Sequence, residues 1–84
     1  MRMDLITFRS ITPAQRGQRI LQAAGIGCTL QRTPKLLAQQ GCGYCLRLRE
    51  EMLDEALRQL RDGSIQFRKI YLQHPEGSVE EVTR

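Results

Sequence analysis

Hydrophobic and polar residues are arranged along four segments of the chain in ways that are typical of β-strands. Met3–Phe8 is apolar and rich in strand-forming residues, residues 28–32 alternate between apolar and polar side chains, and Tyr44–Arg49 alternates strongly. Ile65–Leu72 is the last run of this kind. The pattern therefore predicts four strands.

Two further segments have the spacing of amphipathic helices. The first begins at Thr12-Pro13, where threonine can cap and proline suits the first helical position, and it ends at Gly25. The second spans Glu50–Asp62, with apolar residues every three or four positions and acidic residues ahead of its arginines, as the helix dipole favours. A second Thr-Pro pair predicts one or two helical turns over Pro34–Gln39.

The resulting order, β-α-β-β-α-β, predicts an α+β protein with the ferredoxin-like plait. In that fold two helices cover one face of a four-stranded antiparallel sheet with the spatial strand order 4-1-3-2. We expect residues 1–72 to form this single domain. Residues 73–84 have no apolar period, so we expect a flexible C-terminal tail in which His74 is solvated.

The charge and the length of the chain narrow the classes of function. The sequence has 13 Lys and Arg residues against 9 Asp and Glu residues, a net charge of +4. This balance suits an anionic partner such as RNA, phosphate or an acidic protein face, and equally an ordinary solvated surface. A chain of 84 residues has no room for a deep enclosed substrate cavity. A carrier, binding module or subunit is therefore favoured over a multi-step enzyme.

The sequence also bears on the location of the protein. It has no stretch near the ~20 apolar residues that a membrane-spanning helix needs, and its N-terminal segment lacks the apolar run of a secretory leader. We expect a cytoplasmic protein without a membrane partner, in a compartment that keeps thiols reduced. The 3 cysteines are an odd number, which argues against a disulfide framework.

Cys42 is the cysteine with the strongest functional indication. Gly41 and Gly43 flank it, which leaves its sulfur accessible. The predicted topology brings several polar and basic residues to the same edge of the sheet: Arg9, Ser10, Arg16, Arg32 and Lys35. Positive charge around a thiol stabilises the thiolate and lowers its pKa from the usual value of about 8.5. The alternative is an ordinary exposed loop cysteine.

The other two cysteines have weaker indications. Cys45 completes a C-x-x-C with Cys42 and points by alternation to the open sheet face, which makes it a possible resolving thiol. Cys45 lies at the start of a predicted strand, whereas the cysteines of thioredoxin-type motifs lie at the start of a helix. Whether the pair forms a disulfide stays open, because an extended segment would hold the two Cα atoms about 10 Å apart and a disulfide needs less than about 7 Å. Cys28 lies at the opposite end of the sheet and is expected to be a buried structural residue.

A metal site is not expected. A structural zinc site usually takes four ligands in two paired motifs, and this chain offers one C-x-x-C, the distant Cys28 and His74. We also find no Cys-His pair, no phosphate-binding glycine loop and no carboxylate pair that would identify an enzyme or a cofactor site. No cofactor is therefore predicted, and whether the protein is an enzyme stays open.

Several short segments in the same order resemble the small bacterial family of selenium/sulfur carrier-like proteins, over about residues 4–72. The segments are Leu5–Ser10, Ala14–Gly17, Gly25-Ile26, Arg32–Pro34 and Gly41–Tyr44. The resemblance implies that the Cys42 thiolate accepts sulfur or selenium, as a persulfide or selenylsulfide, and hands it to a partner enzyme that handles these elements. It also implies that Arg9 and Arg16 line the site, with Tyr44 beside it. Cys45 departs from the family pattern, in which a small residue is usual, and this argues against an essential C-x-x-C mechanism.

Two other classes of function fit the same pattern of elements. In the first, the protein is a regulatory or assembly subunit that pairs through its open sheet face, for example as a homodimer, and its cysteines are incidental. In the second it is an RNA-binding module, since RNA-recognition motifs share the element order. Such modules place aromatic residues on the central strands, and the required aromatic-rich motif is absent here. Nucleic acid is therefore not the expected partner.

Overall fold

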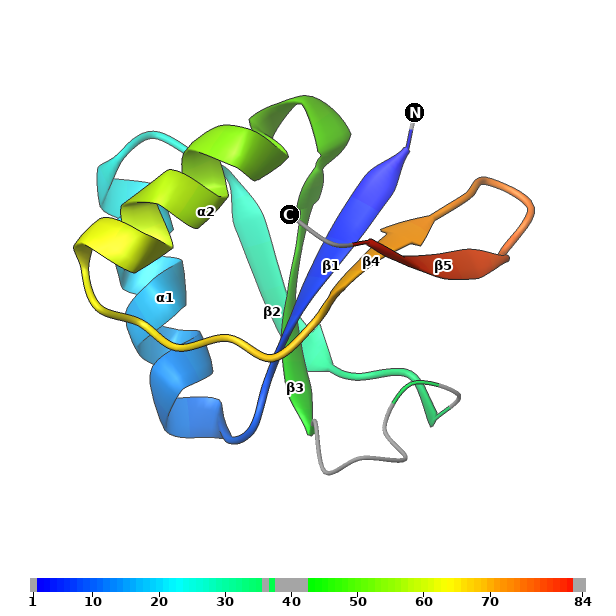
Figure 1. The fold of residues 1–84 in the computed structure, drawn as a ribbon, viewed down its shortest axis with the longest axis horizontal. Helices are drawn as coiled ribbons and strands as arrows, with labels where there is room; N and C mark the ends of the chain where they lie inside the picture. The colour runs from blue at the N-terminus through cyan, green and yellow to red at the C-terminus, as the bar shows by residue number, and fades with distance from the viewer. Residues whose placement is uncertain (1, 36, 38–42, 83–84) are drawn as a thin grey trace.

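The computed structural model describes residues 2–35, 37 and 43–82 of the chain. These residues form a five-stranded sheet with both α-helices packed on one of its faces (Figure 1). In chain order the elements are β1 (Met3–Phe8), α1 (Ile11–Ala23), β2 (Cys28–Arg32), β3 (Tyr44–Arg49), the 3-10 helix η2 (Glu50–Met52), α2 (Leu53–Asp62), β4 (Ile70–Gln73) and β5 (Val79–Val82). The predicted α+β class with two helices is thus confirmed. Of the predicted turn over Pro34–Gln39, residues 34, 35 and 37 are described, and the N–H of Leu37 donates to the carbonyl of Pro34 at 2.8 Å; the other three residues lie outside the described part.

The sheet has the strand order β2-β3-β1-β4-β5, and each neighbouring pair is antiparallel. The first four strands of this order are those of the expected plait. The prediction of a four-stranded sheet is wrong, however, because β5 pairs with β4 and becomes an edge strand. The last strand also differs from the prediction. We expected it over Ile65–Leu72, but the observed strand β4 spans Ile70–Gln73, so residues 65–69 are not part of it.

The fifth strand replaces part of the tail that we expected over residues 73–84. A tight turn precedes it, in which the N–H of Gly77 donates to the carbonyl of His74 at 2.9 Å and the N–H of His74 donates to the carbonyl of Ser78 at 2.8 Å. Pro75 suits the second position of such a turn, and Gly77 adopts a φ of 101°, which L side chains rarely allow. This turn reverses the chain and places β5 beside β4.

The core lies between the sheet and the helices. Ile6 of β1 and Leu46 of β3 pair across the sheet, and both are fully buried beneath α1 and α2. The close approach of α1 depends on Gly17, because a Cβ atom there would lie 3.1 Å from the side chain of Leu60 on α2. This close packing places α1 directly against α2 and the strands beneath them.

A buried carboxylate lies on the same side of the sheet. Asp4 has no exposed surface, and Arg2 reaches it at 3.7 Å while also pairing with Glu50 of η2. The backbone N–H of Glu50 donates to the carbonyl of Arg2 at 3.2 Å. These contacts join the start of β1 to the start of η2.

The sheet face opposite the helices is less open than the sequence suggested. Leu5, Thr7 and Cys45 belong to this face by strand register, yet all three are 0% exposed. The face that we predicted for Cys45 is therefore the observed one, but its side chain is buried there. Along this face β1 and β3, which are described in full, present no aromatic side chain; Phe8 and Tyr44 pair on the side of the core.

The described part of the chain contains no helix that is long and apolar enough to cross a membrane.

Candidate functional site

One edge of the sheet gathers the ends of three neighbouring strands. Phe8 of β1 pairs with Tyr44 of β3, which in turn pairs with Arg32 of β2. One position further on, the N–H of Thr33 donates to the carbonyl of Gly43 at 3.1 Å. Gly43 is exposed and follows Cys42 directly in the chain. The predicted meeting of β1, β2 and β3 at this edge is therefore present.

Gly41 and Cys42 themselves lie outside the described residues. Their assignment to the site stays a prediction, as does any disulfide between Cys42 and Cys45. The structure does describe the next residue, Gly43, and the ends of the strands around it.

A cavity of about 250 Å³ opens at the same end of β1. Its lining combines the residues that follow β1, the first turn of α1 and the segment before β4: Arg9, Ser10, Pro13, Gln66, Phe67 and Arg68. The sequence led us to expect Arg9 and Ser10 in the site. It gave no indication of the other segment, because residues 65–69 read as a continuous strand.

Hydrogen bonds to Thr7 hold that segment against β1. The N–H of Arg68 donates to the carbonyl of Thr7 at 2.7 Å, and the N–H of Thr7 donates to the carbonyl of Lys69 at 2.8 Å. The Thr7 hydroxyl also donates to the Lys69 carbonyl at 3.1 Å and accepts from the Lys69 N–H at 3.0 Å. Arg68 is therefore held by its backbone beside the end of β1, where Arg9 begins the connection to α1.

The cations that the sequence predicts at this edge, together with Arg68, have no anionic partner among the described residues. Five exposed side chains share this property: Arg9, Arg16, Arg32, Lys35 and Arg68. Arg9 and Arg68 line one cavity, and the guanidinium of Arg32 lies 5.8 Å from the centroid of the Tyr44 ring. Arg16 and Lys35, which the sequence also suggested, line neither this cavity nor the one described below.

The two described cysteines are in environments that disfavour the thiolate. Burial raises the pKa of the Cys45 thiol, and the polar side chains of Thr33 and Gln31 oppose this effect only in part. Burial also raises the pKa of the Cys28 thiol, which is half-buried against the core at the opposite end of the sheet. Both groups therefore favour the unreactive thiol form.

No group of three or more His, Cys, Asp or Glu residues in the described part of the chain is arranged to hold a metal ion.

Neither the curated proteins nor the solved structures contain a match to this chain. A family model described as "Putative Se/S carrier protein-like" matches residues 4–72, a span that runs from β1 into β4 and excludes β5. Because this span is most of the 84 residues, the chain belongs to the family that this model describes.

Proposed function

We propose that this protein carries sulfur or selenium, and that the thiolate of Cys42 is the carrier group. The observation that supports this most directly is the family match, whose span of residues 4–72 includes the segment Gly41–Tyr44. The described surroundings of Gly43 support it further, because they hold several exposed cations without anionic partners.

The chemistry is an exchange at sulfur that needs no added oxidant. Cys42 loses its proton to solvent, and the thiolate attacks the terminal sulfur of a donor persulfide, R–S–SH. The new bond joins the Cys42 sulfur to that terminal sulfur, the donor S–S bond breaks, and the donor leaves as the thiolate R–S⁻. Cys42 then holds a persulfide. A donor of the form R–S–SeH would leave a selenylsulfide by the same steps.

The exposed cations of the edge have two roles in this proposal. They lower the pKa of the Cys42 thiol, since nearby positive charge stabilises a thiolate. They also stabilise the anionic terminal sulfur or selenium after transfer, and Arg9 and Arg68 are suited to this because both residues line one cavity. Delivery then requires a partner enzyme that attacks the terminal atom and releases the Cys42 thiolate.

Cys45 is not needed for this cycle. Its side chain is 0% exposed and burial raises its pKa, so it supplies little thiolate at neutral pH. We therefore assign the transfer to Cys42 alone, and a resolving role for Cys45 would require this side chain to become exposed.

The test is loading with a low-molecular-weight persulfide, followed by mass spectrometry of the intact protein. We expect the unmodified protein, Cys28→Ser and Cys45→Ser each to gain one sulfur atom, and Cys42→Ser to gain none. The added atom should leave when a thiol reductant is supplied. Equal loading of Cys42→Ser and the unmodified protein would overturn the proposal.

A further inference from the structure

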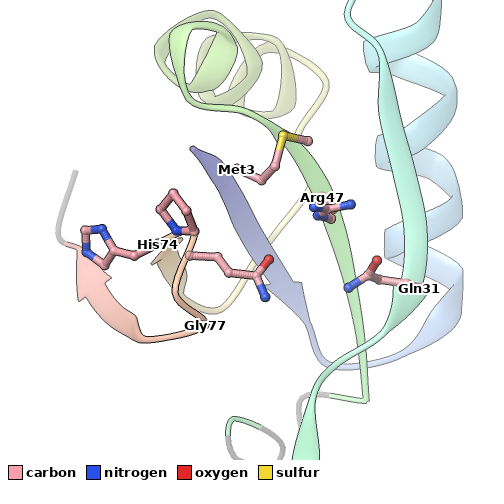
Figure 2. A pocket seen from close by; sticks show the side chains of 7 residues that line it. Met3, Gln31, Arg47, His74 and Gly77 are labelled. Carbon is pink, nitrogen blue, oxygen red and sulfur yellow. The ribbon is translucent and has the colours of Figure 1, made fainter. Parts of the chain in front are cut away.

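A second cavity lies on the sheet face opposite the helices, and it shares no residue with the cavity at Arg9. Its volume is about 310 Å³. Strands β1 to β4 contribute one side chain each and the β4–β5 turn supplies a wall; the lining residues are Met3, Gln31, Arg47, Gln73, His74, Pro75 and Gly77. Figure 2 shows these side chains standing on the sheet with the turn beside them.

The charge balance of this cavity is positive. Among the described residues that line it there is no carboxylate, and the guanidinium of Arg47 is exposed and forms no ion pair with any described residue. The other cations of this face differ, since Arg49 pairs with Glu51 at 2.9 Å and Lys69 pairs with Glu81 at 3.1 Å. Arg47 is therefore an exposed cation in this cavity that the described part of the chain does not neutralise.

Two amide side chains accompany that guanidinium. Gln31 comes from β2 on one side of Arg47, and Gln73 comes from β4 on the other side of β1. Figure 2 shows the side chains of Gln31 and Arg47 on neighbouring strands of the same sheet face, and Gln73 lines the same cavity. A planar guanidinium with flanking N–H donors matches the oxygen atoms of a carboxylate or a phosphate group.

The wall formed by the turn is held in place by its own hydrogen bonds. The N–H groups of His74 and Gly77 bond within the turn, and the His74 imidazole lies 3.5 Å from Glu80 of β5. The cavity is therefore built before any ligand arrives, which reduces the ordering that binding would otherwise require.

We infer that this cavity binds a small molecule through a carboxylate or phosphate group held by Arg47, with Gln31 and Gln73 as additional donors. The volume is at the lower end of the range for ligand sites, about 300–1,000 Å³, so the ligand is a small metabolite rather than a nucleotide cofactor. The inference does not rest on the carrier function. The turn and β5 lie beyond residues 4–72, so this site uses a part of the chain that the family model does not include.

The experiment is a titration of the full chain followed by two-dimensional NMR of its backbone amides. Three probes are added separately, namely malonate, inorganic phosphate, and sodium chloride at matched ionic strength. Arg47→Gln removes the charge and keeps much of the side chain. Arg49→Gln is the matched control, because it lies on the same strand and the same face, is paired with Glu51 and does not line the cavity.

We expect malonate or phosphate to shift the amide signals of Gln31, Arg47, Gln73 and Gly77, with saturation, and sodium chloride not to do so. A preference between the two probes identifies the group that the site holds. Arg47→Gln should weaken the affinity about tenfold or more, as loss of a charged hydrogen-bond partner does, and Arg49→Gln should change it less than about twofold. The spectra of both variants also report whether each is folded.

Three outcomes would overturn the inference. One is that neither anion produces saturable shifts at these residues. Another is that sodium chloride at equal ionic strength reproduces the shifts. The third is that Arg47→Gln and Arg49→Gln weaken binding equally, which would indicate general electrostatic attraction to a basic surface.

Discussion

The guanidinium of Arg32 lies over the ring of Tyr44, 5.8 Å from its centroid, at the edge of the sheet where β2 and β3 end. Tyr44 is separated from Cys42 only by Gly43. A cation–aromatic contact at an exposed position contributes about 0.5–1 kcal/mol, enough to favour one orientation of the arginine. Its position makes Arg32 the most direct test of whether charge at this edge acts on the thiol that we propose as the carrier group.

Removing the charge of Arg32 should make Cys42 less reactive. Exposed charge pairs contribute about 0.2–1 kcal/mol, so Arg32→Gln should slow alkylation of Cys42 at neutral pH by up to about fivefold, while Arg32→Lys should stay near the unmodified rate. The measurement is the alkylation rate of each cysteine against pH, resolved by mass spectrometry. Arg49→Gln is the control, because Arg49 lies at the other end of β3 and pairs with Glu51. Equal rates in Arg32→Gln and the unmodified protein would show that this charge does not act on the thiol.

The buried thiol of Cys45 should make stability depend on alkaline pH. Burial raises its pKa in the folded protein, so above the ordinary cysteine pKa of about 8.5 the unfolded chain ionises first. The stabilisation is therefore complete below that pH and is lost as pH rises through the folded-state pKa. Unfolding by urea under reducing conditions should give a free energy that falls with pH in this range. Cys45→Ala should fall less steeply, whatever its stability at neutral pH, and Cys28→Ala tests the smaller contribution of a half-buried thiol. Parallel curves for Cys45→Ala and the unmodified protein would contradict this.

The elements up to α2 could be predicted from the sequence because their signals are local. Met3–Phe8 and Tyr44–Arg49 agree with the structure at both ends, and the Thr12-Pro13 pair lies in the first turn of α1. The predicted helix over Glu50–Asp62 begins as the 3-10 helix η2 and continues as α2. The order of β2, β3, β1 and β4 follows once these elements are known, since few arrangements of a β-α-β-β-α-β chain bury both helices on one face.

β5 was missed because its stability is not local. Val79–Val82 has two valines around two glutamates, a pattern too short and too polar to indicate a strand. Pairing with β4 holds it in place. The turn before it did carry a signal, since proline followed two residues later by glycine is typical of a hairpin turn.

The same limit applies to the candidate site. Alternation assigns Cys45 to the correct face but does not tell whether that face is covered, and the side chain proves to be buried. Arg68 enters the cavity at Arg9 through backbone hydrogen bonds to Thr7, a contact between residues far apart in the chain. Its charge was visible in the sequence, but its position at this edge was not.

The packing of α1 should depend on the absence of a side chain at Gly17. Its position within 3.1–3.4 Å of Leu60, Leu46 and Phe8 leaves no space for the branches of valine, so Gly17→Val should destabilise the protein by about 1–3 kcal/mol. Valine has a higher helix propensity than glycine by roughly a few tenths of a kcal/mol. This difference favours the variant but is too small to offset the steric cost. Gly27→Val is the matched control, because a Cβ atom there meets no other atom within 4 Å. Unfolding by urea should leave this control within about 0.5 kcal/mol of the unmodified protein. Equal stability of the two variants would mean that α1 can move away from α2.

The β4–β5 hairpin should depend on the conformation of Gly77. At a φ of 101° a Cβ atom is strained even though the space around it is free, so Gly77→Ala should cost about 1–2 kcal/mol. Because β4 is the one strand that pairs with β5 in the described sheet, this cost should appear first as local opening of the hairpin rather than as unfolding of the core. Hydrogen exchange should therefore become about tenfold faster or more at the amides that join β5 to β4, with little change in β1 and β3. Gly27→Ala should leave exchange in the hairpin unchanged, since its φ is not in the positive range. Faster exchange throughout the sheet would instead show that β5 unfolds together with the core, in which case the wall of the Arg47 cavity is as stable as the domain itself.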